Sequence, residues 1–220
     1  MKGNTMRHTI IFDLDGTLLY TLEDLKDAVN YALRTRGYAE HKLEEMRRFF
    51  GNGIRFALQQ AEPTLPDAEI DELIVLFKEY YGKHSMDNTM PYDGVLPLMQ
   101  TLSEQGCRMA IVSNKVDEAV KDLAAHFFGD YVRVAIGNRA DIRRKPAPDT
   151  VFAALEELGA SKDDAVYIGD SEVDLATARA AGLPCITVLW GFREKDFLIE
   201  QGADCFAERP EEIPEILENL

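Results

Sequence analysis

The chain has 220 residues, 46% of them hydrophobic, which is enough for one large domain or a core with a smaller insert. Its formal net charge of −15 disfavours nucleic acid and anionic membranes as partners. No apolar run approaches the ~18 residues of a membrane span, and residues 1–8 lack the apolar stretch of a signal peptide. Three widely spaced cysteines favour reduced thiols. We therefore expect a globular, cytoplasmic protein.

Apolar, strand-like runs alternate with helical patterns along most of the chain. The first run, residues 10–12, ends at a pair of aspartates. Later runs cover residues 109–112, 132–136, 165–168 and 185–189, and amphipathic helical patterns cover 116–123, 151–158 and 172–181. This alternation predicts βαβ units. The expected fold class is α/β, a doubly wound, mainly parallel sheet of the Rossmann type.

Residues 19–87 interrupt the alternation, because they contain no convincing strand. Helical patterns are expected over 21–36 and 43–50, after Gly53 and from about Pro66. Thr21 and Asp24 fit a short-acid form of the capping box at the first of these helices. We therefore expect an α/β core of residues 1–18 and 88–220, with an all-helical insert between them. Both connections leave the core beside the paired aspartates, so the insert is expected to cover them like a lid.

The segment Asp13-Leu14-Asp15-Gly16-Thr17 follows the first strand directly. Two carboxylates this close repel each other, and folding alone gives no reason to place them at a strand end. A bound cation or a proton-transfer role would give one. The alternative is an Asp-Gly turn without chemistry, although the pattern arises by chance only about once in 10⁵ positions.

Three further polar segments follow later strands. They are Ser113-Asn114-Lys115, Lys145-Pro146-Ala147-Pro148-Asp149 and the stretch from Gly169 to Asp174. Open α/β sheets bind ligands at the carboxyl ends of their strands, so all four segments are expected to share one pocket.

These four segments, in this order, resemble the motifs of the haloacid dehalogenase superfamily, in particular its phosphatases with a helical cap inserted after the first motif. The resemblance covers nearly the whole chain. Within that branch the chain is most similar to the phosphoglycolate phosphatase group, on the evidence of Tyr92-Asp93-Gly94-Val95, the lysine segment and the final acidic motif.

The resemblance implies catalytic roles for three residues. Asp13 is the nucleophile that forms an aspartyl-phosphate, and Asp15 is the general acid and base. Lys145 places a positive charge against Asp13 and the transferred group. As an alternative, Lys145 belongs to a solvated surface run with Arg143 and Arg144.

The resemblance also implies a Mg²⁺ site formed by the Asp13 carboxylate, the Asp15 backbone carbonyl and the Asp170 carboxylate, with Asp174 orienting these ligands from behind. The alternatives are a plain turn at Asp170 and a favourable charge at a helix N-terminus for Asp174.

Phosphate oxygens need hydrogen-bond donors. The expected donors are the Ser113 hydroxyl and the Asn114 backbone N–H. Thr17 has a less specific expected role, in holding the loop or the phosphate. The alternative for Ser113 and Asn114 is a helix N-cap. Arg55, in a loop that resembles the substrate-specificity loop of these phosphatases, is a candidate for a substrate carboxylate, and a solvent-facing arginine is the alternative.

Two segments depart from the family pattern. Tyr20-Thr21 stands where relatives often have Asp-Ser, and residues 137–141 differ from the more usual Gly-Gly-Asp. Phosphoglycolate therefore remains the best guess for the substrate but is left open.

The leading hypothesis is a Mg²⁺-dependent phosphomonoester hydrolase acting on a small phosphorylated metabolite, as a monomer or homodimer. The alternatives are a sugar phosphomutase similar to β-phosphoglucomutase, and a catalytically dead binding protein. Against the last, no motif aspartate is missing and the motif lysine is present.

Overall fold

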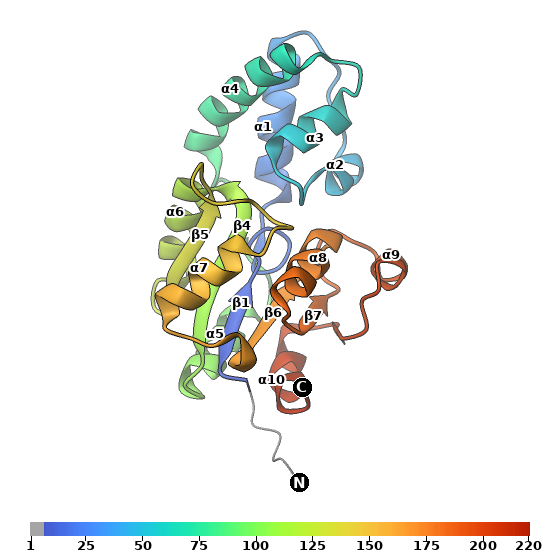
Figure 1. Cartoon of the computed structure of the whole chain (residues 1–220). Coiled ribbons are helices and arrows are strands. Elements are labelled where there is room, and N and C mark those ends of the chain that lie inside the picture. Colours follow the sequence, from blue (N-terminus) through green and yellow to red (C-terminus); the bar gives the residue numbers. More distant parts are fainter. Residues whose placement is uncertain (1–6) are drawn as a thin grey trace. The chain divides into compact units, whose positions relative to one another are not determined.

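The computed structural model describes residues 7–220. The chain forms two compact units, one of residues up to 18 together with 91–220, and one of residues 19–90 (Figure 1). The chain returns to the first unit at residue 91, where the sequence led us to expect 88.

The first unit is built on a sheet of six parallel strands. The strands are β1 (Thr9–Phe12), β4 (Arg108–Val116), β5 (Val132–Asn138), β6 (Ala165–Gly169), β7 (Cys185–Val188) and β8 (Phe206–Ala207). Their order in the sheet is β5-β4-β1-β6-β7-β8. The chain builds outward from β1 to β5 on one side and then crosses to β6 on the other. The order thus reverses beside β1, which is where such sheets bind ligands.

Helices cover both faces of this sheet. They are α5 (Val95–Glu104), α6 (Asp117–Phe128), α7 (Asp149–Leu158), α8 (Glu172–Ala181), α9 (Lys195–Glu200) and α10 (Ile213–Glu218), with short 3-10 turns at Lys162–Asp164 and Pro210–Glu212. Residues of α7 and α8 pack on Ile11 and Tyr167 at one face, and α6 lies behind the sheet (Figure 1). Since β1 and β6 are buried on both faces, most of their residues are apolar. The predicted α/β fold with a mainly parallel sheet is confirmed.

The second unit contains four helices, in the places where the sequence predicted them. They are α1 (Leu22–Thr35), α2 (Leu43–Phe49), α3 (Ile54–Ala61) and α4 (Asp67–His84). Two short strands, β2 (Leu19–Tyr20) and β3 (Met90–Pro91), pair with each other at its two ends. The expectation that this stretch holds no strand was therefore wrong. A run of two residues is too short to produce an alternating pattern in the sequence.

Strand β4 is longer than expected. It continues through Ser113 and Asn114 to Val116, which is the N-cap of α6. The N-cap alternative for Ser113 and Asn114 is therefore wrong. Two hydrophobic residues of the expected helical patterns are exposed: Val116 (39%) at the strand end and Phe152 (45%) on α7.

The capping box expected at the start of α1 is absent. Thr21 is the N-cap but its side chain makes no capping hydrogen bond. Asp24, only 2% exposed, instead accepts hydrogen bonds of 2.8 to 3.1 Å from the backbone N–H groups and side chains of Asn88 and Thr89. The carboxylate thus satisfies donors of the returning segment, far away in the sequence, and ties that segment to α1.

Replacing Asp24 by alanine should leave the buried donors of Thr89 and the part-buried donors of Asn88 without this acceptor. We expect Asp24→Ala to lower the free energy of unfolding by about 2–4 kcal/mol, measured by urea denaturation. Asp27→Ala is the matched control, because Asp27 lies on the same helix with its side chain 44% exposed and pairs only with Lys26 among the described ion pairs. Equal losses in the two variants would contradict the role given to Asp24.

Candidate active site

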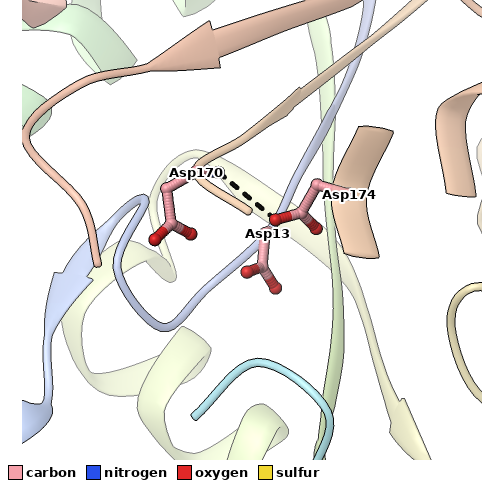
Figure 2. Close-up of side chains that lie close together, drawn as sticks. All are labelled: Asp13, Asp170 and Asp174. Carbon is pink, nitrogen blue, oxygen red and sulfur yellow. Dashed lines mark hydrogen bonds between the residues drawn. The ribbon is translucent and has the colours of Figure 1, made fainter. Parts of the chain in front are cut away.

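The carboxyl ends of β4, β1 and β6 lie side by side in the sheet and carry three of the four polar segments that the sequence singled out. The fourth, which contains Lys145, lies between β5 and α7. Asp13 comes directly after β1, and its backbone N–H donates to the Ile168 carbonyl of β6 at 2.9 Å. Asp170 follows β6, and Asp174 lies in the first turn of α8. Figure 2 shows the three carboxylates next to one another. One oxygen from each lies within 4.8 Å of the others.

Lys145 lies between two of these carboxylates. Its Nζ is 2.7 Å from Asp13 Oδ1, 2.8 Å from Asp174 Oδ1 and 3.0 Å from the hydroxyl of Tyr167. The lysine side chain is 2% exposed, which excludes the solvated-surface alternative. Burial by itself lowers the pKa of Lys145, but Asp13 and Asp174 outweigh it and raise the pKa above its ordinary value. The site therefore contains a fixed positive charge.

Asp174 is surrounded by donors. Its Oδ1 accepts from Lys145 and from the Tyr167 hydroxyl at 2.9 Å. Its Oδ2 accepts from the backbone N–H of Asp170, the contact dashed in Figure 2, and from the N–H and hydroxyl of Ser171. Burial raises the pKa of Asp174, but Lys145 and these hydrogen bonds outweigh it and lower the pKa. Asp174 is thus an anion with both oxygens engaged, which suits a positioning role better than direct ligation.

The negative charges of Asp170 and Asp13 are balanced by fewer stabilising contacts than that of Asp174. Burial, and then repulsion from Asp174, raises the pKa of Asp170 to about 7. Burial and Asp174 also raise the pKa of Asp13 well above its usual value, although Lys145 opposes the shift. The Thr17 hydroxyl donates to Asp170 Oδ1 at 3.2 Å and the Phe192 N–H to Oδ2 at 2.7 Å. A cation between Asp13 and Asp170 would relieve this repulsion.

The carboxylate oxygens of this site are suitable ligands for a hard divalent cation. Mg²⁺ binds carboxylate and carbonyl oxygens and keeps several waters. Asp13 and Asp170 offer buried, mutually repelling carboxylates, and Gly16 leaves the Asp170 side chain room, since a Cβ there would lie 2.4 Å from Asp170 Oδ2. The residues present can therefore hold Mg²⁺.

Asp15 stands apart from this group of three. Both of its oxygens accept from Lys115 Nζ, at 2.7 and 2.9 Å. The sequence alone indicated no role for Lys115. The available signal was strand periodicity: Lys115 is two residues after Ser113, so an extended backbone puts both on one face.

The other expected site residues fall into two sets. Ser113 is buried, and its Oγ accepts from the Lys115 backbone N–H at 3.2 Å. The Asn114 side chain donates to the Lys145 carbonyl at 3.1 Å and so supports the lysine loop. Arg55 belongs to the other unit, where it pairs with Asp71 and, at 3.6 Å, with Asp67.

A segment that no sequence motif indicated also contacts the site. Trp190, between β7 and α9, donates from its indole N–H to the Thr17 carbonyl at 2.9 Å. The Phe192 N–H that binds Asp170 belongs to the same segment. It follows a strand end like the recognised motifs but has no acidic or basic pair to mark it.

Comparison with known proteins agrees with this geometry. Residues 10–188 match the haloacid dehalogenase-like hydrolase family. The chain belongs to this family.

Relatives and solved structures match over nearly the full length. A phosphoglycolate phosphatase of Xylella fastidiosa (strain Temecula1) is 35% identical over 213 residues, covering 96% of this chain and 93% of that protein. One from Rhodobacter capsulatus is 36% identical over 194 residues, covering 86% and 87%. The crystal structure of a candidate phosphoglycolate phosphatase from Lactobacillus delbrueckii subsp. bulgaricus has a TM-score of 0.92 at 36% identity, covering 97% and 99%. The resemblance inferred from the motifs is confirmed.

In this haloacid dehalogenase-like hydrolase, as far as residues 7–220 show, no helix is long and apolar enough to cross a membrane.

The repulsion among the acidic residues gives a stability prediction for the metal-free hydrolase. The pKa of Asp170 is about 7 when folded and near 4 when unfolded, so the folded state binds the proton more tightly. Wild-type stability should therefore fall as pH rises from about 4 to about 7. Asp170→Asn cannot ionise, and in EDTA we expect it to be more stable than wild type by on the order of 2 kcal/mol at pH 8.

The measurement is urea denaturation of both proteins in EDTA at pH 5 and pH 8. The advantage of Asp170→Asn should be larger at pH 8. An advantage that shrinks or disappears at pH 8 would contradict the electrostatic account of the site.

Proposed function

We propose that this protein is a Mg²⁺-dependent phosphomonoester hydrolase that acts on a small phosphorylated metabolite through an aspartyl-phosphate on Asp13. The enzyme class, a phosphatase, is confirmed by the family and by the names of the relatives. The observation that carries the mechanism is the buried contact of 2.7 Å between Lys145 Nζ and Asp13 Oδ1, beside the Asp170 carboxylate.

In the first step Asp13 attacks phosphorus. Because Oδ1 is held by Lys145, we assign the attack to Oδ2. The new bond joins Oδ2 to phosphorus, the bond from phosphorus to the ester oxygen breaks, and that oxygen takes a proton from Asp15. In the second step Asp15 accepts a proton from water, the water oxygen bonds to phosphorus, and the bond from phosphorus to Oδ2 breaks, which releases phosphate and restores the Asp13 carboxylate.

Asp15 must change partners for these steps. Lys115 Nζ donates to both of its oxygens. A carboxyl group that transfers a proton to the ester oxygen must come within hydrogen-bond reach of that oxygen. We therefore infer that at least one oxygen of Asp15 leaves Lys115 when substrate binds.

The transferring phosphoryl group needs charge neutralisation and donors. Mg²⁺ held by Asp13, the Asp15 carbonyl and Asp170 would supply the first, together with Lys145. The Ser113 oxygen already accepts from Lys115 N–H, which leaves its hydroxyl hydrogen to donate to a phosphate oxygen. The Asn114 N–H and Thr17 complete the proposed set, with Asp174 positioning Lys145 from behind.

The substrate is proposed from the relatives. Several are named phosphoglycolate phosphatase, so phosphoglycolate is the first compound to test. The departures at Tyr20-Thr21 and at residues 137–141 make a screen necessary. We propose that the helical unit of residues 19–90 acts as the cap that selects the substrate, with Arg55 as a candidate contact to a substrate carboxylate that would have to compete with Asp67 and Asp71.

The function is tested by a phosphate-release screen over phosphoglycolate, sugar phosphates, nucleoside monophosphates and pyrophosphate, with Mg²⁺ and with EDTA. Release that requires Mg²⁺ is expected for at least one compound. Isomerisation of β-glucose 1-phosphate without phosphate release, or full activity in EDTA, would contradict the proposal.

Asp13→Asn should remove the nucleophile while keeping its shape. We expect kcat to fall by at least about 10³-fold, measured by phosphate release, with the far-UV circular dichroism spectrum unchanged. Asp196→Asn, on the exposed start of α9, is the control and should retain full activity. Wild-type turnover in Asp13→Asn would exclude Asp13 as the nucleophile.

Asp170→Asn should weaken the proposed metal site, because an amide binds Mg²⁺ less strongly than a carboxylate. The Mg²⁺ concentration for half-maximal activity should rise by roughly 10–100-fold, measured by titrating MgCl₂ at saturating substrate. An unchanged titration would show that Asp170 is not a ligand.

A further inference from the structure

Residues Trp190–Arg193, here called the clamp segment, run from the end of β7 toward α9 and contact two of the recognised motifs. The Trp190 indole N–H donates to the Thr17 carbonyl at 2.9 Å. The Phe192 backbone N–H donates to Asp170 Oδ2 at 2.7 Å. The first contact fixes the loop after β1, and the second fixes the carboxylate after β6.

Gly191 brings the backbone of the clamp segment against both motifs. A Cβ at this position would lie 2.2 Å from the Asp170 Cβ and 2.5 Å from the Gly16 carbonyl oxygen. Both neighbours are backbone or the base of a short side chain, so neither can move aside easily. Only glycine permits this approach.

Arg193 anchors the other end of the clamp segment. Its Nε is 2.7 Å from Glu172 Oε2, and its second terminal nitrogen is 3.1 Å from Oε1. The arginine side chain is 9% exposed, and a bidentate pair of this kind has defined geometry. Glu172 begins α8, two residues after Asp170. The clamp segment is thus fastened on both sides of its contact with Asp170.

We propose that the clamp segment is a positioning element that orients the Asp170 carboxylate and the backbone of residues 15–17, and thereby sets the affinity for Mg²⁺. The inference rests on the proposed function. Phe192 N–H and the Thr17 hydroxyl hold one oxygen of Asp170 each, so together they fix the plane of the carboxylate. Trp190 and Gly191 hold the turn that contains the Asp15 carbonyl. Contacts of this kind behind metal ligands tune affinity.

Trp190 is also a built-in reporter, because it is the one tryptophan of the chain. Titration of the full-length protein with MgCl₂ should change its fluorescence emission in a saturable way, with the same Kd that calorimetry gives. Asp170→Asn should abolish the change over the same concentration range. A wild type that binds Mg²⁺ by calorimetry without any change in emission would overturn the proposal.

Two variants test the contacts directly. Trp190→Phe keeps an aromatic ring and removes the donor to Thr17, and Arg193→Gln removes the pair with Glu172. We expect each to raise the Kd for Mg²⁺, measured by calorimetry without substrate, by roughly tenfold. Arg209→Gln is the matched control, because it breaks an exposed pair with Glu212, and its Kd should stay at the wild-type value.

A merely structural role would lower the melting temperature of the metal-free variants and leave their Kd within twofold of wild type, which would overturn the proposal. The proposed function fails differently: the wild type itself would show no Mg²⁺ binding by calorimetry and would keep its activity in EDTA. If a variant does not fold, the emission of wild-type Trp190 still decides the proposal.

Discussion

The ammonium group of Lys145 lies between the buried carboxylates of Asp13 and Asp174, within 2.8 Å of both. Removing Lys145 would leave two buried carboxylates without their positive partner, a situation that destabilises proteins by several kcal/mol. The position of the proposed nucleophile thus depends on a lysine 132 residues later in the chain. The Tyr167 hydroxyl accepts a hydrogen bond from Lys145 Nζ, and the Asn114 amide donates one to the Lys145 carbonyl, so both contacts stabilise the lysine in this position.

The negative charge of this group of residues is only partly balanced by positive charge and hydrogen-bond donors. Asp174 has donors on both oxygens, whereas the pKa values of Asp13 and Asp170 are raised by burial and by neighbouring negative charge. Carboxylates crowded in this way lower the stability of a fold unless something else binds to them. Such local conflict is expected at functional sites. A divalent cation would convert the repulsion into binding energy, which is why the proposed function and the electrostatics support each other.

The sheet topology makes this crowding unavoidable. The order reverses beside β1, so the polar segments at the carboxyl ends of β1, β4 and β6 lie at one edge of the sheet. The clamp segment after β7 contacts the same edge. Each side chain comes from a separate strand end, and none of the contacts among Asp13, Lys145 and Asp170 is local in sequence. The sheet positions the segments at its edge, and side chains of those segments supply the functional groups.

The fold class, most helices and strands, and the four motifs could be predicted from the sequence, because apolar periodicity and rare polar patterns are local properties. The sequence did not show the pairing of Asp15 with Lys115, the anchoring of Asn88 and Thr89 by Asp24, or the clamp segment. Those contacts join residues that lie from 21 to 173 positions apart. A single polar residue or glycine carries no periodic pattern that indicates which distant residue it contacts. These contacts were therefore identified from the structure.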